Sequence, residues 1–122
     1  MIKNKRIIVN MGDPAGIGPD LCVHLSQKKF NASIYILGNK KTIDDRAKLL
    51  NKKFSLSTRD ESHKNNSNLF IIEVDYPETV IPGKPNKINS ITQFKNMNFI
   101  VNELLQKKYD ALITLPISKY ML

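Results

Sequence analysis

Three glycines and two prolines crowd one stretch of ten residues near the N-terminus, and this combination favours the binding of an anion. The stretch reads MGDPAGIGPD and follows a short β-branched run. Gly12, Gly16 and Gly18 can take positive φ angles and let a ligand approach the backbone, while Pro14 and Pro19 stiffen the turn. A helix that begins after such a turn offers unpaired N–H groups and a partial positive charge. The stretch therefore predicts a rigid turn that brings backbone donors to a phosphate or a carboxylate.

The spacing of this turn leaves a second interpretation open. It is neither the dinucleotide fingerprint G-x-G-x-x-G nor a P-loop, because no Lys-Ser/Thr pair follows the last glycine. A tight strand-to-helix turn without any ligand is the alternative. Asp13 carries the same ambiguity, because its carboxylate can bind a hydroxyl or amide group of a ligand or can accept hydrogen bonds from its own loop.

A second candidate segment, ITLPISK at residues 113–119, also follows a strand-like run. Thr114 and Ser118 supply hydroxyl groups, and Pro116 fixes the bend of the chain. Lys119 supplies a positive charge that can meet a phosphate. The alternative for Lys119 is a solvated lysine at the start of a helix.

The elements that must position these segments alternate between strand and helix. The expected strands cover residues 6–9, 33–38, 54–57, 69–74 and 110–114, and the expected helices cover residues 19–29, 42–50 and 91–108. The strands are short continuous apolar runs, as in parallel sheets that are covered on both faces. We therefore expect one α/β domain, a layered and mainly parallel sheet flanked by helices. Ligands of such sheets bind beyond the carboxyl ends of the strands, where both candidate segments lie.

Composition excludes several classes of function. The chain has 122 residues, of which 41% are hydrophobic, and no apolar run approaches the ~20 residues that cross a bilayer. The apolar part of the N-terminus is too short for a signal peptide, so we expect a cytoplasmic protein without a membrane partner. The single cysteine, Cys22, cannot form an internal disulfide. The net charge of +8 comes from scattered lysines without a basic stripe among aromatics, so we expect no nucleic-acid partner.

The two segments together, MGDPAGIGPDL and DALITLPISK, resemble the 4-hydroxythreonine-4-phosphate dehydrogenase family of vitamin B6 biosynthesis. The first segment is also similar to the GDGIGPE turn of the isocitrate and isopropylmalate dehydrogenase superfamily. The resemblance covers the whole chain but less than half of a family member. It implies an isocitrate/isopropylmalate dehydrogenase-like fold that is incomplete here, a single partial domain at residues 1–122.

The resemblance also implies a function for the full-length family. That function is the NAD- or NADP-dependent oxidation of a phosphorylated small-molecule substrate, 4-phosphooxy-threonine, on the way to pyridoxal phosphate. A divalent metal (Zn, Mg or Co) assists the reaction, and the family works as a homodimer. The implied cofactor-binding residues are Asp13, Gly16 and Gly18, and the implied substrate-binding residues are Thr114 and Lys119.

No catalytic or metal-binding residue is carried over, because the family's metal-binding histidines lie in the part that is absent here. His24 and His63 match no metal-site pattern, and we assign them surface or packing roles. Leu115 stands where the family usually has a small residue, and a bulky side chain there would obstruct a ligand. We expect an N-terminal fragment that is inactive alone, with an exposed edge strand and low solubility. The alternatives are a stand-alone anion- or nucleotide-binding module without catalysis and a basic nucleic-acid-binding domain.

Overall fold

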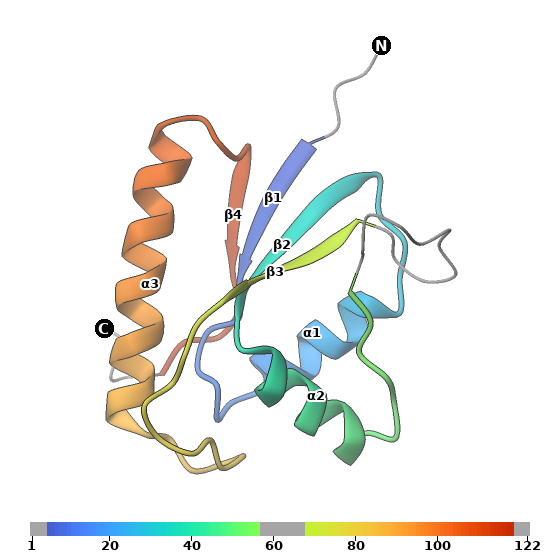
Figure 1. Ribbon diagram of the computed structural model, residues 1–122, viewed down its shortest axis with the longest axis vertical. Helices are drawn as coiled ribbons and strands as arrows, with labels where there is room; N and C mark the ends of the chain where they lie inside the picture. The colour runs from blue at the N-terminus through green and yellow to red at the C-terminus, as the bar shows by residue number, and fades with distance from the viewer. Residues whose placement is uncertain (1–4, 57–67, 119–122) are drawn as a thin grey trace.

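The computed structural model describes residues 5–56 and 68–118, which form one four-stranded sheet with three helices (Figure 1). Predicted features at residues 57–67 and 119–122, including His63 and Lys119, lie outside the described residues. The elements in chain order are β1 (Lys5–Asn10), α1 (Gly18–Ser26), β2 (Ala32–Gly38), α2 (Lys40–Leu49), β3 (Leu69–Glu73), α3 (Lys87–Leu105) and β4 (Ala111–Thr114).

The sheet is parallel throughout, in the order β3-β2-β1-β4. Neighbouring side chains of β1 face opposite sides, as the period of a strand requires. Val9 packs with residues of α1 and α2, whereas Ile8 packs with Ile100 of α3. Helices α1 and α2 therefore cover one face and α3 the other (Figure 1). The predicted α/β class and layered parallel sheet are confirmed.

Two helices begin earlier than their apolar periods predict. Helix α2 begins at Lys40, because the side chain of Asn39 accepts the amide of Thr42 at 2.9 Å and so caps the helix. The helix therefore begins two residues before the predicted start at residue 42. Helix α3 begins at Lys87 rather than at residue 91, and Asn86 caps it by the same geometry.

The strand predicted at residues 54–57 is absent from the described part of that segment. Phe54 is buried in the core cluster beneath α1 and α2, but residues 54–56 join no ladder of the sheet. The alternation of apolar and polar residues here reflects packing of a loop against the core.

Within residues 5–56 and 68–118, no helix is both long enough and apolar enough to cross a bilayer.

Strand β4 forms one edge of the described sheet. It pairs with β1 only, and its outer side carries no strand among the described residues. Ile113 points to the same face as its partner Val9, yet half of its surface is exposed. Helices α1 and α2 thus leave this part of the sheet uncovered. An uncovered apolar edge is the geometry on which the expectation of low solubility depends.

Cys22 lies fully buried on α1, within the core cluster on that face of the sheet. Burial raises the pKa of its thiol from 9.0 to about 12. The thiolate is the reactive form, so at pH 8 its fraction is about a thousandfold below that of an exposed thiol. We expect a thiol reagent to modify the native protein at least ~100-fold more slowly than the urea-unfolded chain. Equal rates in the two states would contradict this packing.

The same shift has a consequence for stability against pH. The folded-state pKa of Cys22 lies above the unfolded value, so the group supports the fold fully below about pH 9. Its contribution is lost as the pH rises from 9 toward 12, because only the unfolded chain ionises readily.

Candidate functional site at the carboxyl edge of the sheet

The turn after β1 and the segment after β4 lie against each other at the carboxyl edge of the sheet. The amide of Asp13 donates to the carbonyl oxygen of Pro116 at 3.1 Å, and the amide of Leu115 donates to that of Asn10 at 2.9 Å. Gly12 has a φ of 78°, and a Cβ there would overlap the Pro116 carbonyl oxygen. The structure therefore brings together the two segments that the sequence singles out.

The glycines of the turn serve close packing more than unusual backbone angles. Among the three, only Gly12 has a positive φ, so Gly16 and Gly18 do not use their freedom to take positive angles. Gly18 is required for another reason: a Cβ there would overlap the carbonyl oxygen of Met11. A Cβ at Gly16 would make only ordinary contacts, and its nearest atom would be the Asp13 carbonyl oxygen at 3.4 Å.

Most backbone donors of the turn already have partners within the protein. The Gly12 amide donates to the side-chain oxygen of Asn10 at 3.3 Å. The amides of Ala15 and Gly16 donate at 3.0 Å to the side-chain and main-chain oxygens of Asp13. These donors are not free for a ligand. The sequence predicts that the turn offers its backbone donors to an anion, and the structure leaves fewer of them available. At the start of α1, the amides of Ile17 and Gly18 make no hydrogen bond within the described chain.

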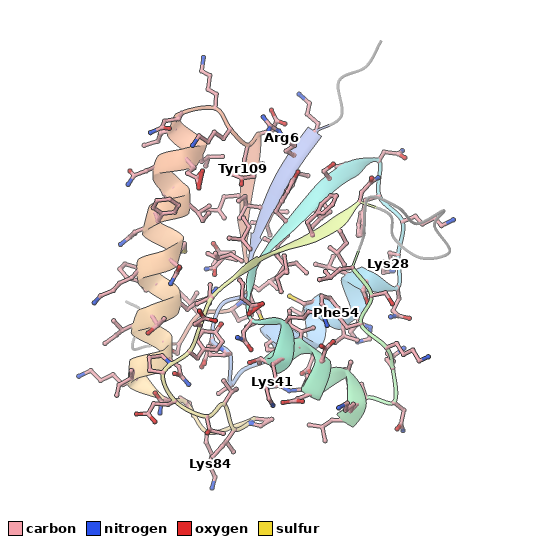
Figure 2. All side chains as sticks on the ribbon, in the orientation of Figure 1. Arg6, Lys28, Lys41, Phe54, Lys84 and Tyr109 are labelled. Atoms are coloured by element: carbon pink, nitrogen blue, oxygen red, sulfur yellow. The ribbon has the colours of Figure 1, made fainter. Side chains whose placement is uncertain are left out.

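The carbonyl oxygens of the turn are also bonded, and two of them by Arg46 of α2. Its Nη1 donates to the Gly16 oxygen at 2.7 Å and its Nη2 to the Pro14 oxygen at 3.2 Å. The oxygen of Ala15 accepts from the amide of Gly83 at 2.8 Å. Gly83 belongs to the turn at residues 81–84, from which Lys84 points away from the body of the protein (Figure 2).

The sequence motifs do not identify Arg46 as a residue of the site, although its position in the helical period indicates that it lies near buried residues. It lies three residues after Ile43 and directly before Ala47, so the helical period places it beside the buried face of α2. An arginine there needs buried acceptors. The partly exposed Asp20 of α1 supplies a further acceptor, with its Oδ1 at 3.2 Å from Nη1 of Arg46.

Asp13 is buried, with 7% of its surface exposed. One carboxylate oxygen accepts the Ala15 amide, which matches the alternative that Asp13 bonds to its own loop. No cation of the described residues forms an ion pair with this carboxylate, and no hydrogen bond within them reaches its Oδ2. A buried carboxylate oxygen without a donor is costly, so Oδ2 is the atom that a ligand donor would satisfy. Both of the roles considered for Asp13 are therefore compatible with its surroundings.

The second segment is partly accessible. Thr114 ends β4 opposite Asn10 and is exposed, whereas Ser118 donates to the hydroxyl of Ser90 on α3 at 3.1 Å. Leu115 packs against the core cluster on the α1 and α2 face of the sheet. Its bulk is therefore directed at least partly into the core.

A buried polar network beneath the site was not predicted. Nε2 of Gln93 donates to Oδ1 of Asn10 at 2.6 Å and to the carbonyl oxygen of Leu37 at 2.9 Å. The hydroxyl of Tyr76 donates to Oε1 of Gln93 at 2.6 Å. Burial raises the pKa of Tyr76, so this hydroxyl remains a donor across the physiological range. The network joins α3 to the carboxyl ends of β1 and β2.

The described residues do not fit a resident divalent metal. Within them, no three side chains of His, Cys, Asp and Glu converge to form a candidate site. His24 is exposed in the last turn of α1, far along the helix from the turn at its start.

Comparison with known proteins decides the family. A family model described as pyridoxal phosphate biosynthetic protein PdxA matches residues 29–122. The chain belongs to the PdxA family. The resemblance noted in the sequence is thereby confirmed. The match begins after the glycine turn, so it rests on the remainder of the α/β domain.

Curated relatives of this PdxA-family chain are 4-hydroxythreonine-4-phosphate dehydrogenases. That of Vibrio vulnificus is 29% identical over 119 residues, which cover 94% of this chain and 36% of the relative. That of Methylococcus capsulatus is 31% identical over 118 residues, with 93% and 36% covered. The PdxA-family chain thus spans about a third of the length of these relatives.

Solved structures show the same fold. The 4-hydroxythreonine-4-phosphate dehydrogenase of Burkholderia phymatum superposes with a TM-score of 0.75 at 17% identity, over 98% of this chain and 38% of that one. The enzyme of Klebsiella pneumoniae gives a TM-score of 0.73 at 21% identity, with 97% and 38% covered. The PdxA-family chain therefore has part of the fold of these enzymes, as predicted.

Proposed function

We propose that this chain forms the cofactor- and phosphate-binding edge of a PdxA-type dehydrogenase, which oxidises 4-phosphooxy-threonine with NAD or NADP in pyridoxal phosphate biosynthesis. One observation carries the proposal: in a chain of this family, residues 11–18 and 114–118 meet at the carboxyl ends of β1 and β4. Helix α1 follows β1 on one face, and α3 precedes β4 on the other. Strand order therefore reverses between β1 and β4, which is where open α/β sheets bind their ligands.

The residues at this edge have complementary tasks in the proposal. The free amides of Ile17 and Gly18 begin α1, where the partial positive charge of the helix favours a phosphate. Oδ2 of Asp13 accepts a ligand hydroxyl, and Gly16 leaves space beside it. Thr114 and Lys119 contact the phosphorylated substrate. The nicotinamide group, when bound, supplies the hydride acceptor for oxidation of the substrate hydroxyl.

Catalysis needs more than the described residues contain. They supply no metal site, so we expect the chain alone to bind ligand without turnover. The proposal also includes a homodimer that works in the cytoplasm. The support for both is the family resemblance.

Titration calorimetry with NAD, NADP and a phosphorylated hydroxy-amino acid tests the proposal. We expect binding of at least one of these ligands, and we expect Asp13→Asn to weaken it about 10-fold, because a charged acceptor becomes a neutral amide. Asp75→Asn is the control, since Asp75 is exposed and follows β3, which is separated from β1 by β2. Equal affinities of the two variants would remove Asp13 from the site.

Two further outcomes separate the alternatives. Failure to bind any of these ligands, together with DNA binding that falls steeply with salt, would replace the proposal with a nucleic-acid-binding function. Steady formation of NADH by the isolated chain with added metal would contradict the expectation that it is inactive alone.

A further inference from the structure

Arg46 is a buried cation whose partners belong mainly to the glycine turn. Only 7% of its side chain is exposed. Its guanidinium donates to the carbonyl oxygens of Pro14 and Gly16 and to Oδ1 of Asp20. It therefore connects α2 to the turn and to the first turn of α1. We propose that Arg46 is a positioning residue, which sets the orientation of the turn's peptide groups and so aims the Ile17 amide at a ligand.

The geometry of the peptide group carries this step. In a trans peptide the C=O and the following N–H point in opposite directions, and no cis peptide occurs in the described chain. The Gly16 oxygen points at Arg46 at 2.7 Å, so the Ile17 N–H of the same peptide points away from it. The Pro14 oxygen also points at Arg46, so the Ala15 N–H points away, where it meets the Asp13 carboxylate.

The chemistry of the guanidinium explains why an arginine is suited to this place. Its planar fork offers five donors in a fixed arrangement, which lets one side chain hold two carbonyl oxygens and a carboxylate together. The ammonium group of a lysine is a single compact centre on a flexible stem and cannot span both carbonyls in the same way. The buried charge is balanced by Asp20, whose side chain is 31% exposed.

Amide hydrogen exchange followed by NMR tests the proposal in the whole chain. The variants are Arg46→Met, Arg46→Lys and, as control, Lys48→Met, which removes an exposed charge from the same helix. In Arg46→Met we expect exchange at Ala15 and Gly16 to accelerate at least ~10-fold relative to the control, while exchange in the strand cores stays unchanged. In Arg46→Lys we expect exchange rates at these two amides between those of Arg46→Met and those of the Lys48→Met control.

Ligand binding gives a second measurement, which depends on the proposed function. We expect Arg46→Met to weaken NAD binding about 10-fold and Lys48→Met to leave it unchanged, because only the first releases the Ile17 peptide. If the unaltered protein binds no nucleotide, the proposed function fails while hydrogen exchange still decides the role of Arg46. Exchange at Ala15 and Gly16 equal to that of the control would overturn the proposal. An equal acceleration in β1 and β2 would also overturn it, because Arg46 would then be a general stabiliser.

Discussion

The substitution Gly18→Ala is expected to lower the free energy of unfolding by about 3 kcal/mol or more. The added Cβ would overlap the carbonyl oxygen of Met11, which is a backbone atom that cannot rotate aside. Gly18 and Met11 are both buried, so the overlap is relieved only by separating α1 from the end of β1. Urea unfolding followed by circular dichroism measures the effect as a lower midpoint.

Gly16→Ala is the matched control within the same turn. A Cβ at Gly16 meets its nearest atom at 3.4 Å, and the φ of this residue is not positive. We therefore expect a change of less than about 1 kcal/mol, of either sign. Similar midpoints for the two variants would show that the approach of Met11 to Gly18 is not a requirement of the fold.

The second large effect is expected from Gln93→Leu, which should cost about 3–5 kcal/mol. Gln93 is fully buried and holds three partners at once. Leucine leaves the buried hydroxyl of Tyr76 without its partner. It also removes one donor each from the carbonyl oxygen of Leu37, which keeps the Met11 amide, and from Oδ1 of Asn10, which keeps the Gly12 amide. Each buried polar group that loses its partner costs about 1–3 kcal/mol.

Thermal and urea unfolding of Gln93→Leu should be compared with Gln106→Leu. The control makes the same substitution at an exposed position at the end of α3, where no side-chain partner is lost among the described residues. We expect the control to remain within about 0.5 kcal/mol of the original protein. A Gln93→Leu protein as stable as the control would mean that the network contributes little net stability.

The sequence predicts the fold class because each strand is a short apolar run and each helix has an apolar period. It also places the two candidate segments at one edge of the sheet, because both follow parallel strands. The starts of α2 and α3 were missed, since Asn39 and Asn86 cap the helices through side-chain oxygens that no apolar pattern reveals. The strand predicted at residues 54–57 is not formed in the described part of this run, because Phe54 can be buried in the core without pairing to a neighbouring strand.

The details of the site depend on contacts between distant parts of the chain. Arg46 lies 30 residues from Gly16, and Gln93 lies 83 residues from Asn10. The helical period suggests that Arg46 is close to the buried face of α2, but it does not say which carbonyl oxygens the guanidinium meets. For the same reason, the sequence could not show that most amides of the turn are already bonded inside the protein.

The contacts of the glycine turn constrain how this protein can diverge. Its backbone atoms are held by Asn10 before it, Arg46 on α2, Gly83 in a later turn and Pro116 after β4. Gly83 and Pro116 act through main-chain atoms, whereas Asn10 and Arg46 act through side chains that a substitution removes. Among homologues, accepted changes at positions 10 and 46 should therefore occur in combination, while neighbouring surface positions drift independently.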